Sequence, residues 1–337
     1  MEFRVYIVRR LLLMLVVLFG VVSITFVVSH VVPADPIGAI LGPKAPLEAI
    51  EKMRHEWGLD RPLHEQFINY VWNLLHGHLG KSIRTNRPIV LDLMERFPDT
   101  IELSTASIII AVCLGIPLGI VSACRKDKIP DHFARVFSLF GISLPVFWLG
   151  LVLLMIFYYH LHWLPSPGPY DTHLSPPTAV TGFISLDSLI AGDIGLFLNH
   201  LQHLILPAFV LGFSATASIA RMTRSSMLEV LRQDYIKAAR SKGLKERAVV
   251  FKHALRNAMI PTTTIIGLSY GSLLEGAVLT ETIFAWPGLG TYVTSAILFL
   301  DFQAVMSTTL LIAVTYSLCN LIVDLLYAFL DPRIKYG

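Results

Sequence analysis

Charged side chains are scarce in this chain of 337 residues. Only 15% of the residues are Asp, Glu, Lys or Arg, whereas 54% are hydrophobic. Soluble globular proteins carry about 25% charged residues, so the composition excludes an ordinary soluble protein. The formal net charge of +3 is also small. Without a strong basic excess, a nucleic-acid partner is not expected.

Cysteines are few as well. Cys113, Cys124 and Cys319 lie in or beside apolar runs and have no paired spacing. This arrangement predicts neither a disulfide framework nor a zinc site. His200 and His203 are spaced like two metal ligands, but no carboxylate or thiolate accompanies them nearby in the sequence. We therefore interpret them as histidines at the membrane interface.

Motifs for catalysis and nucleotide binding are incomplete. The segment HGHLGKS at residues 76–82 ends like a phosphate-binding loop, but Leu75 stands where that loop requires its first glycine. His55 begins a zinc-protease pattern in which Leu59 replaces the second histidine. A G-x-S-x-G motif surrounds Ser269, yet it lies inside an apolar run and not at a strand-to-helix turn. None of these patterns forms a convincing catalytic site.

Long apolar runs are what the chain has instead. Six of them reach the roughly 20 residues that span a bilayer, at residues 10–32, 101–123, 133–159, 201–220, 258–280 and 304–330. The first follows a basic stretch like that of a signal peptide, but it exceeds the roughly 7–15 apolar residues of such a peptide and lacks a cleavage site. We therefore expect an all-α membrane protein with six transmembrane helices and a retained N-terminal anchor.

Glycines recur four residues apart in two of these runs. The pairs are Gly115 with Gly119 and Gly267 with Gly271. Residues four apart share one face of a helix, and the missing side chains allow another helix to approach closely. Both pairs therefore predict helix–helix contacts.

The distribution of Lys and Arg sets the orientation, because basic residues next to a span stay in the cytoplasm. Basic residues gather at the N-terminus, after the second span and in residues 221–256, whereas residues 161–200 and 281–303 contain none. Residues 33–100 carry eight Lys or Arg, but so long a connection is translocated regardless of charge. Both chain termini are therefore predicted to be cytoplasmic.

This topology divides the chain into segments. We expect an N-terminal segment with the first span, an outer helical segment, a core of five spans containing one cytoplasmic loop, and a cytoplasmic tail, at residues 1–32, 33–100, 101–330 (loop 221–257) and 331–337.

Two outer regions look ordered. Pro46 and Pro62 each precede a short helical pattern that ends at a glycine, Gly58 or Gly77, which predicts two short helices. Residues 164–193 are rich in Pro, Gly, Ser and Thr, which is typical of an ordered loop. We expect the two helices to form a docking surface for a partner protein outside the membrane. We expect the loop to gate the outer opening between the spans.

Charges inside the spans are costly and need partners or a function. Glu275 lies near the outer end of the fifth span, where it either lines a pathway for a cationic group or has a structural role, in which it reaches the outer interface or pairs within the bundle. Both interpretations stay open. Asp324 lies near the inner end of the sixth span, where pairing with Arg333 or Lys335 is expected.

The most informative segment is the cytoplasmic loop. Asp234 is expected to cap a helix that runs through Lys242, and Gly243 to end it in the left-handed conformation. A second helix follows, with one apolar face made by Leu244, Ala248, Phe251 and Leu255. Small residues in the first helix would fit a partner's groove, with the basic residues pairing at its rim. A basic face lying on anionic lipid is the alternative, and charge alone does not separate the two.

The amino-acid sequence of this loop is more specific than its charge. KAARSKG at residues 237–243 resembles the EAA-x-x-x-G loop of permease subunits in bacterial ABC importers, and residues 234–244 are similar to the peptide and nickel branch. Further segments resemble the first permease subunit of that branch, at residues 33–36, 77–82, 96–103, 143–148, 220–230, 253–261 and 280–290. Three positions depart from the pattern: Lys237 replaces Glu, Arg256 replaces a proline, and Ala34 replaces Gly.

The resemblance implies a type I ABC importer permease fold in the bacterial inner membrane. It implies a second homologous permease, two cytoplasmic ATPase subunits that bind ATP and Mg, and a solute-binding protein, while this chain is no enzyme and binds no cofactor or metal. It assigns contact with the ATPase to a set of loop residues, namely Asp234, Tyr235, Ala238, Ala239, Arg240, Lys242, Gly243 and Leu244. A side chain at Gly243 would strain the turn.

The cargo follows only from a finer resemblance. Residues 181–190 are most similar to dipeptide permeases, and longer peptides, glutathione, nickel chelates and haem are the alternatives. Two rival classes remain: a transporter that works alone, for which inverted repeats would be needed, and an intramembrane hydrolase using Ser269.

Overall fold

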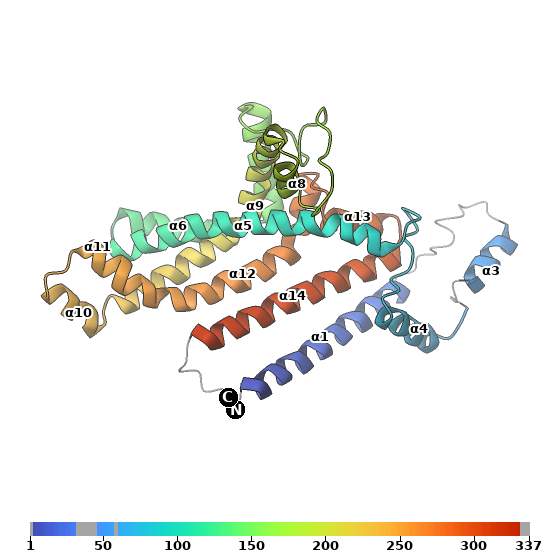
Figure 1. Ribbon diagram of the computed structural model, residues 1–337, viewed down its shortest axis with the longest axis horizontal. Helices are drawn as coiled ribbons and strands as arrows, with labels where there is room; N and C mark the ends of the chain where they lie inside the picture. The colour runs from blue at the N-terminus through green and yellow to red at the C-terminus, as the bar shows by residue number, and fades with distance from the viewer. Residues whose placement is uncertain (1–2, 32–45, 57–59, 331–337) are drawn as a thin grey trace.

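The computed structural model describes residues 3–31, 46–56 and 60–330 of the chain. These ranges are helical apart from turns, loops and one isolated bridge between Lys81 and Pro88. Figure 1 shows the helices, which in chain order are α1 (Phe3–Val31), α3 (Leu47–Glu56), α4 (Leu63–Leu75), α5 (Ile89–Cys124), α6 (Ile129–Ser143), α7 (Val146–Leu154) with the π-helix η1 (Met155–His160), α8 (Ile184–Ile190), α9 (Ile194–Val230), α10 (Asp234–Ser241), α11 (Glu246–Ala248) with the π-helix η2 (Val249–Ala254), α12 (Leu255–Ile283), α13 (Leu289–Leu298) and α14 (Phe302–Leu330).

Helices occupy all six predicted spans, and the all-α membrane fold is confirmed. Within the described ranges, α1, α5, α9 and α14 are each long and apolar enough to cross a membrane, and α6 with α7 would supply a fifth crossing. Helix α12 has a suitable length of 29 residues but carries many hydroxyl side chains and Glu275. Composition therefore supports four or five crossings, and the sixth stays a prediction.

The predicted span at residues 133–159 is a bent pair of helical segments and not one continuous helix. Helix α6 ends at Ser143, and the next helical segment, Val146–His160, is bent away from it by 106°. The cause is Pro145, because the ring of a proline disfavours helical geometry in the residue before it. Leu144 is accordingly extended, with ψ of 129°.

The centre of the molecule is the contact between α5 and α9, the most extensive of all the helix pairs described. A Cβ atom on Gly115 would lie 2.9 Å from the carbonyl oxygen of Thr216, and one on Gly119 would lie 2.5 Å from Cβ of Thr223. Gly212 of α9 faces α5 just as closely, since its Cβ would lie 2.5 Å from the carbonyl oxygen of Ser107. The packing predicted for the first glycine pair is confirmed.

Helix α14 packs on α12 and α1. Val323 and Tyr316 of α14 contact the positions of Gly267 and Gly271, so the second glycine pair also serves helix packing. Asp324 of α14 pairs with Arg10 of α1, with 3.0 Å between Nη1 and Oδ2. The expected partners Arg333 and Lys335 lie outside the described residues.

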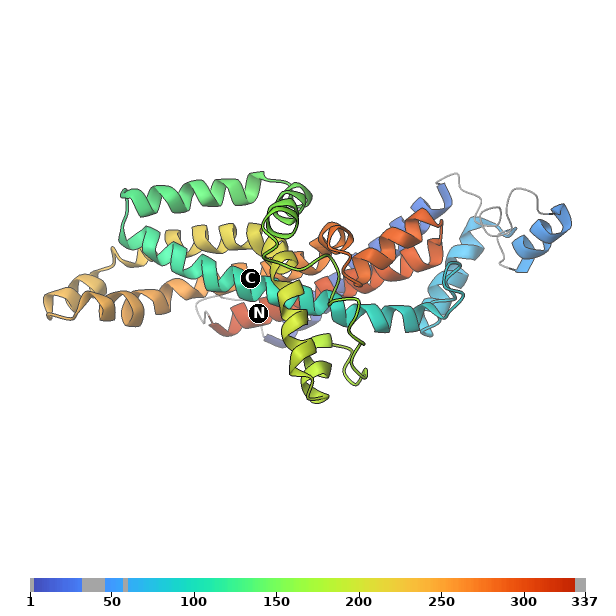
Figure 2. The same cartoon turned by 90° about the horizontal axis from the view of Figure 1, so that it is seen from above.

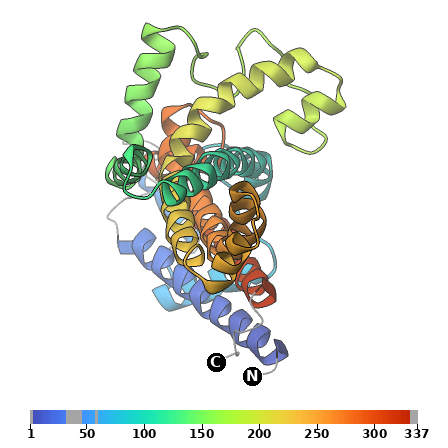
Figure 3. The ribbon, with the colours of Figure 1, turned by 90° about the vertical axis from the view of Figure 1, so that its left-hand side faces the viewer.

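The predicted inner and outer segments lie at opposite ends of the long axis. Figures 1 and 2 show α10 and α11 at one end and α3 and α4 at the other. Viewed along this axis, α7 (green) and the loop that carries α8 (yellow-green) project to one side of the bundle (Figure 3). The cytoplasmic loop and the segment before α5 are thus far apart, and the orientation of the chain in the membrane stays a prediction.

The two outer helices are confirmed. Pro46 and Pro62 each directly precede a helix, and Gly77 follows α4 with φ of +75°; Gly58 lies outside the described residues. Helix α4 packs on α1 through aromatic rings, with centroids 5.1 Å apart for Phe26 and Phe67.

The outer loop at residues 164–193 contains a short helix, α8, that the sequence did not predict. Asp187 of α8 is buried and accepts hydrogen bonds from the backbone N–H groups of Thr181 (2.8 Å) and Gly182 (3.0 Å). Nearer its start, the loop is fixed by a hydrogen bond from the N–H of Gly168 to the carbonyl oxygen of Phe284, at 2.9 Å. The loop is therefore ordered by its own hydrogen bonds and joined to the bundle near its start.

The two histidines are buried inside the protein, so their side chains face neither lipid nor solvent; their depth relative to the membrane interface stays a prediction. His200 donates from Nδ1 to the carbonyl oxygen of Pro169 at 2.7 Å, and its Nε2 lies 3.3 Å from Oε1 of Glu102. In His203, Nε2 lies 3.6 Å from Oδ1 of Asp171. Both side chains therefore hold the outer loop and α5 against α9.

Substitution of Gly212 by Ala is expected to destabilise the protein by about 1–3 kcal/mol, because the added methyl group meets backbone and cannot be accommodated by a rotamer change. The apparent melting temperature of the purified protein in mild detergent measures this. Gly276→Ala is the matched control, since nothing lies within 4 Å of its Cβ position and alanine favours a helix. Equal melting temperatures of the two variants would contradict the packing argument.

Candidate functional site

The cytoplasmic loop is a helix, a glycine turn and a second helix, as predicted, but Asp234 does not cap the first one. The N-cap residue is Gln233, and no side chain caps the helix there. Asp234 lies in the first turn, where its carboxylate accepts a hydrogen bond of 2.8 Å from Nζ of Lys237. This hydrogen bond lowers the pKa of Asp234, so the carboxylate is ionised and compensates Lys237.

Gly243 ends α10 in the left-handed conformation, with φ of +76°. Its N–H donates to the carbonyl oxygen of Arg240 at 2.9 Å, and the N–H of Leu244 donates to that of Ala239 at 3.4 Å. These two bonds form a Schellman motif, which satisfies the last carbonyl groups of a helix. Nothing lies within 4 Å of a Cβ atom at this position, so the preference for glycine comes from the backbone conformation alone.

An ion pair closes the turn from outside. The guanidinium of Arg240 meets the carboxylate of Glu246 through two contacts, Nη2 to Oε1 at 2.6 Å and Nε to Oε2 at 3.2 Å. The hydrogen bond from Arg240 lowers the pKa of Glu246. Such a two-point contact fixes relative orientation as well as distance. It therefore holds α10 at a set angle to α11, a role for Glu246 that the sequence did not predict.

The inner side of α10 packs on its own protein. Ile236 is fully buried and Ala239 is 8% exposed. Both belong to an apolar cluster with residues of α5, α9, η2 and α12, which comprises Ile120, Ala123, Met227, Ile236, Ala239, Val249, Val250, Ala254 and Ala258. Tyr235 adds a polar link, because Nδ2 of Asn257 donates to its hydroxyl oxygen at 2.6 Å. Of the two alanines, only Ala238 faces outward.

The predicted apolar face of the second helix is wrong. Leu244 and Phe251 are 42% and 58% exposed, whereas Val249, Val250 and Ala254 are buried. The reason is the π-helix η2, in which each turn takes more residues than in an α-helix. A prediction with a period of 3.6 residues therefore assigns the wrong side chains to the inner face.

The outer surface of the loop is basic. Between the end of α9 and the start of α12, the exposed Lys and Arg side chains are Arg232, Lys237, Arg240, Lys242, Lys245, Arg247 and Lys252. Among the described residues, only Lys237 and Arg240 of this set have carboxylate partners. The loop therefore presents five cations without a carboxylate partner at one end of the molecule (Figure 1).

Glu275 lies far from this loop along α12. Its side chain is exposed, and no ion pair to it is found in the part of the chain that the structure describes. The structure thus does not pair Glu275 within the bundle, which was one form of the structural interpretation of the sequence.

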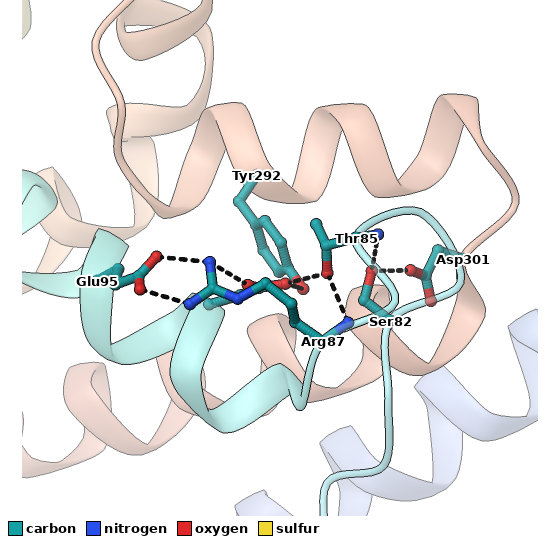
Figure 4. A network of polar contacts seen from close by, with 7 residues as sticks. Ser82, Thr85, Arg87, Glu95, Tyr292 and Asp301 are labelled. Carbon is teal, nitrogen blue, oxygen red and sulfur yellow. Dashed lines mark hydrogen bonds and ion pairs between the residues drawn. The ribbon is translucent and has the colours of Figure 1, made fainter.

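A polar network at the outer end explains the segment that resembles a phosphate-binding loop (Figure 4). Ser82 donates from Oγ to Oδ2 of Asp301 at 2.6 Å, which joins the segment before α5 to the start of α14. Close by, Oγ1 of Thr85 donates to Oδ2 of Asp92 at 2.6 Å. The hydroxyl of Tyr292, from α13, lies 3.2 Å from the same oxygen. The segment that ends at Ser82 therefore has a structural role, because it joins the region before α5 to the start of α14.

Glu281 is a second feature that sequence reasoning missed. It is fully buried at the end of α12, and its carboxylate accepts hydrogen bonds from the hydroxyl of Thr100 at 2.7 Å and from the N–H of Gly290 at 2.6 Å. Gly290 lies in the first turn of α13, where free N–H groups favour a negative charge. Glu281 therefore joins α5, α12 and α13. Glu281 binds an N–H group nine residues later in the chain. No known local sequence pattern predicts such a contact.

Comparison with known proteins defines the class. The family described as binding-protein-dependent transport system inner membrane component matches residues 115–336, and the N-terminal component of this transport system matches residues 3–104. The chain belongs to this family, which confirms the resemblance to importer permeases that the loop and the other motifs predicted.

Individual relatives within this family are named for the transport of particular compounds. The chain is 48% identical over 324 residues to a probable D,D-dipeptide transport system permease protein of Escherichia coli K12, covering 96% of this chain and 95% of the relative. It is 44% identical over 336 residues to a di/tripeptide transport system permease protein of Pseudomonas aeruginosa UCBPP-PA14, covering 98% of both. A glutathione transport system permease protein of E. coli CFT073 is 37% identical over 331 residues, or 98% of this chain and 99% of the relative.

Glu281→Ala is expected to lower stability by a few kcal/mol, since each buried hydrogen-bonding group left without a partner costs about 1–3 kcal/mol and the N–H of Gly290 and the hydroxyl of Thr100 both lose their acceptor. Yield of monodisperse protein and its melting temperature are the measurements. Glu275→Ala, on the exposed side of the same helix, is expected to leave both unchanged. A similar loss in both variants would argue against the role of Glu281.

Proposed function

We propose that this chain is a transmembrane permease subunit of an ATP-driven importer of dipeptides or short peptides in the bacterial inner membrane. It forms the translocation pathway with a second homologous permease, receives cargo from a solute-binding protein, and binds two cytoplasmic ATPase subunits. The chain itself is non-catalytic, and ATP and Mg bind to the ATPases. The basic, conformationally fixed loop around Gly243 is the observation that carries this proposal, together with family membership.

In this function, α10 is the coupling helix. Its outward residues, among them Ala238, Arg240 and Lys242, face the ATPase, and the unpaired cations of the loop meet carboxylates at the rim of an ATPase groove. Ala239 and Ile236 act from the inner side, because they seat α10 on the apolar cluster beneath it. Asp234, Tyr235, Gly243 and Leu244 set the shape of the helix and its turn. Closure of the ATPases then moves α10, and the spans move with it.

The outer segment, residues 33–100, is proposed to dock the solute-binding protein. Helix α4 has one apolar face on α1 and a second, exposed one formed by Ile68, Trp72 and Leu75, at 62%, 63% and 74% exposure. Exposed aromatic and aliphatic side chains at helical spacing are typical anchors of a protein interface. The outer loop at residues 164–193 projects from the side of the bundle (Figure 3) and is proposed to close the outer mouth of residues 101–330, the transport core.

Glu275 is proposed to line the pathway. An exposed carboxylate without an ion pair among the described residues, on a helix of the core, suits the cationic amino group of a peptide. The negative charge of Glu275 would favour transport of a peptide with a free, positively charged N-terminus over cargo that lacks a positive charge.

Dipeptide is the proposed cargo because two of the relatives above are named for dipeptide or di/tripeptide transport, at higher identity than the relative named for glutathione transport. The test is uptake of a labelled dipeptide by cells that lack this gene and by complemented cells, with tripeptide, glutathione and nickel chelate as competitors. Loss of uptake on deletion and competition mainly by dipeptides are expected. If dipeptide uptake survives and the uptake of one competitor collapses, the cargo assignment is wrong.

Gly243→Val is expected to insert and assemble normally yet lose transport. A β-branched residue in the left-handed conformation is strained by roughly 1–2 kcal/mol or more, so the turn changes shape and α10 leaves its groove. Gly243→Asn is the matched control, because asparagine tolerates this conformation, and it is expected to keep most of the uptake. Normal uptake by the valine variant would contradict the coupling assignment.

A further inference from the structure

Asp131, in the first turn of α6, is the centre of a buried polar junction. Its side chain is fully buried. Arg224 binds it through two contacts, Nε to Oδ1 at 2.7 Å and Nη2 to Oδ2 at 2.9 Å. The hydroxyl of Ser122 donates to Oδ1 at 2.5 Å, and the N–H of Asp127 donates to Oδ2 at 2.9 Å. Arg135 lies further off, at 3.9 Å.

The donors come from different parts of the chain. Ser122 lies in the last turn of α5, Asp127 in the turn between α5 and α6, and Arg224 in the last two turns of α9. Helix α9 ends at Val230, and only three residues separate it from α10. The junction therefore lies at the base of the cytoplasmic loop and joins it to two other helices, at the end of the molecule where α10 and α11 project (Figure 1).

Two kinds of contact connect this base to α5 and α6. One is the apolar cluster in which Ile120 and Ala123 of α5 meet Met227 of α9 and Ile236 of α10. Apolar contacts have no preferred direction, so such surfaces slide at little cost. The other is the contact of Arg224 with Asp131, whose two parallel hydrogen bonds fix distance and angle together. The second therefore adds a directional link to the close packing of Gly119 on Thr223 nearby.

Stability alone does not explain this contact. Replacing a buried ion pair by apolar residues of similar volume is often neutral or stabilising, because removing two charges from water offsets their attraction. The contact between Arg224 and Asp131 also shares its carboxylate with the donors Ser122 and Asp127, which an apolar pair would leave without an acceptor. Its directional geometry is what an apolar pair cannot reproduce.

We infer that Arg224 and Asp131 are positioning residues that carry movement of the coupling helix α10, through the end of α9, into α5 and α6. This inference rests on the proposed function of the loop. Loss of the pair leaves the ATPases bound and active but separates ATP hydrolysis from movement of the spans.

The experiment uses the complete importer, with both permeases, the ATPases and the solute-binding protein, reconstituted in proteoliposomes. It measures labelled dipeptide uptake and ATP hydrolysis in the same sample and compares their ratio. The key variant carries Arg224→Met with Asp131→Leu, which keeps the site filled and uncharged. Its ratio is expected to fall by about tenfold or more, since hydrogen bonds between charged groups supply differences of that size, while ATP hydrolysis stays within about twofold.

Arg221→Gln is the matched control. Arg221 is an exposed arginine on the same helix, three residues earlier, with no ion pair among the described residues, and its variant is expected to keep the normal ratio. An unchanged ratio in the double variant would overturn the inference and leave the pair a purely structural role.

A third variant decides the matter if the double variant does not assemble. Arg224→Lys keeps the charge but loses the two-point contact, so the complex is expected to assemble and to show an intermediate ratio; a normal ratio would refute the inference. Failure of the proposed function looks different, because then the unmodified complex itself shows no uptake that depends on ATP.

Discussion

The close approach of α5 and α9 is the contact on which the rest of the structure depends. Gly115, Gly119 and Gly212 bring the two backbones so near that a methyl group at any of them would meet atoms of the other helix. Dispersion and shape, not burial from water, hold helices together in a bilayer, so this fit is decisive. The pair extends from the outer end, where Glu102 meets His200, to the inner end, where Ser122 and Arg224 share Asp131.

The two functional ends are built differently around this pair. At the outer end, buried carboxylates tie several segments together, since Glu281 accepts hydrogen bonds from α5 and α13 and Asp301 accepts them from the segment before α5. At the inner end, an apolar cluster, the hydrogen bond between Asn257 and Tyr235, and one ion pair connect the loop to the spans. The outer end therefore has more buried polar contacts than the inner end, which suits the movement proposed for the loop.

Much of this could be predicted from local patterns. Long apolar runs indicated the helices, prolines and glycines marked α3 and α4, and Gly243 alone predicted its left-handed turn. Pro145 is a local signal for the bend in residues 133–159, but an assignment based on hydrophobicity alone treats the whole apolar run as one span. Other features have no local signal: the π-helix after Ala248 shifts the inner face, and Glu281 and Asp131 find partners on helices distant in sequence. The site was therefore predicted where it depends on backbone conformation and missed where it depends on tertiary contacts.

The bend after α6 has a consequence for the surrounding lipid. With 15 residues and a rise of 1.5 Å per residue, α6 is about 22 Å long, whereas the hydrocarbon core of a bilayer is about 30 Å thick. The helical segment that follows turns away at 106°, so a crossing made by this pair changes direction part of the way through. Helix α6 alone falls several ångströms short of the hydrocarbon thickness, and the lipid beside the bend therefore meets a differently shaped surface from the lipid beside the longer, unbroken α1.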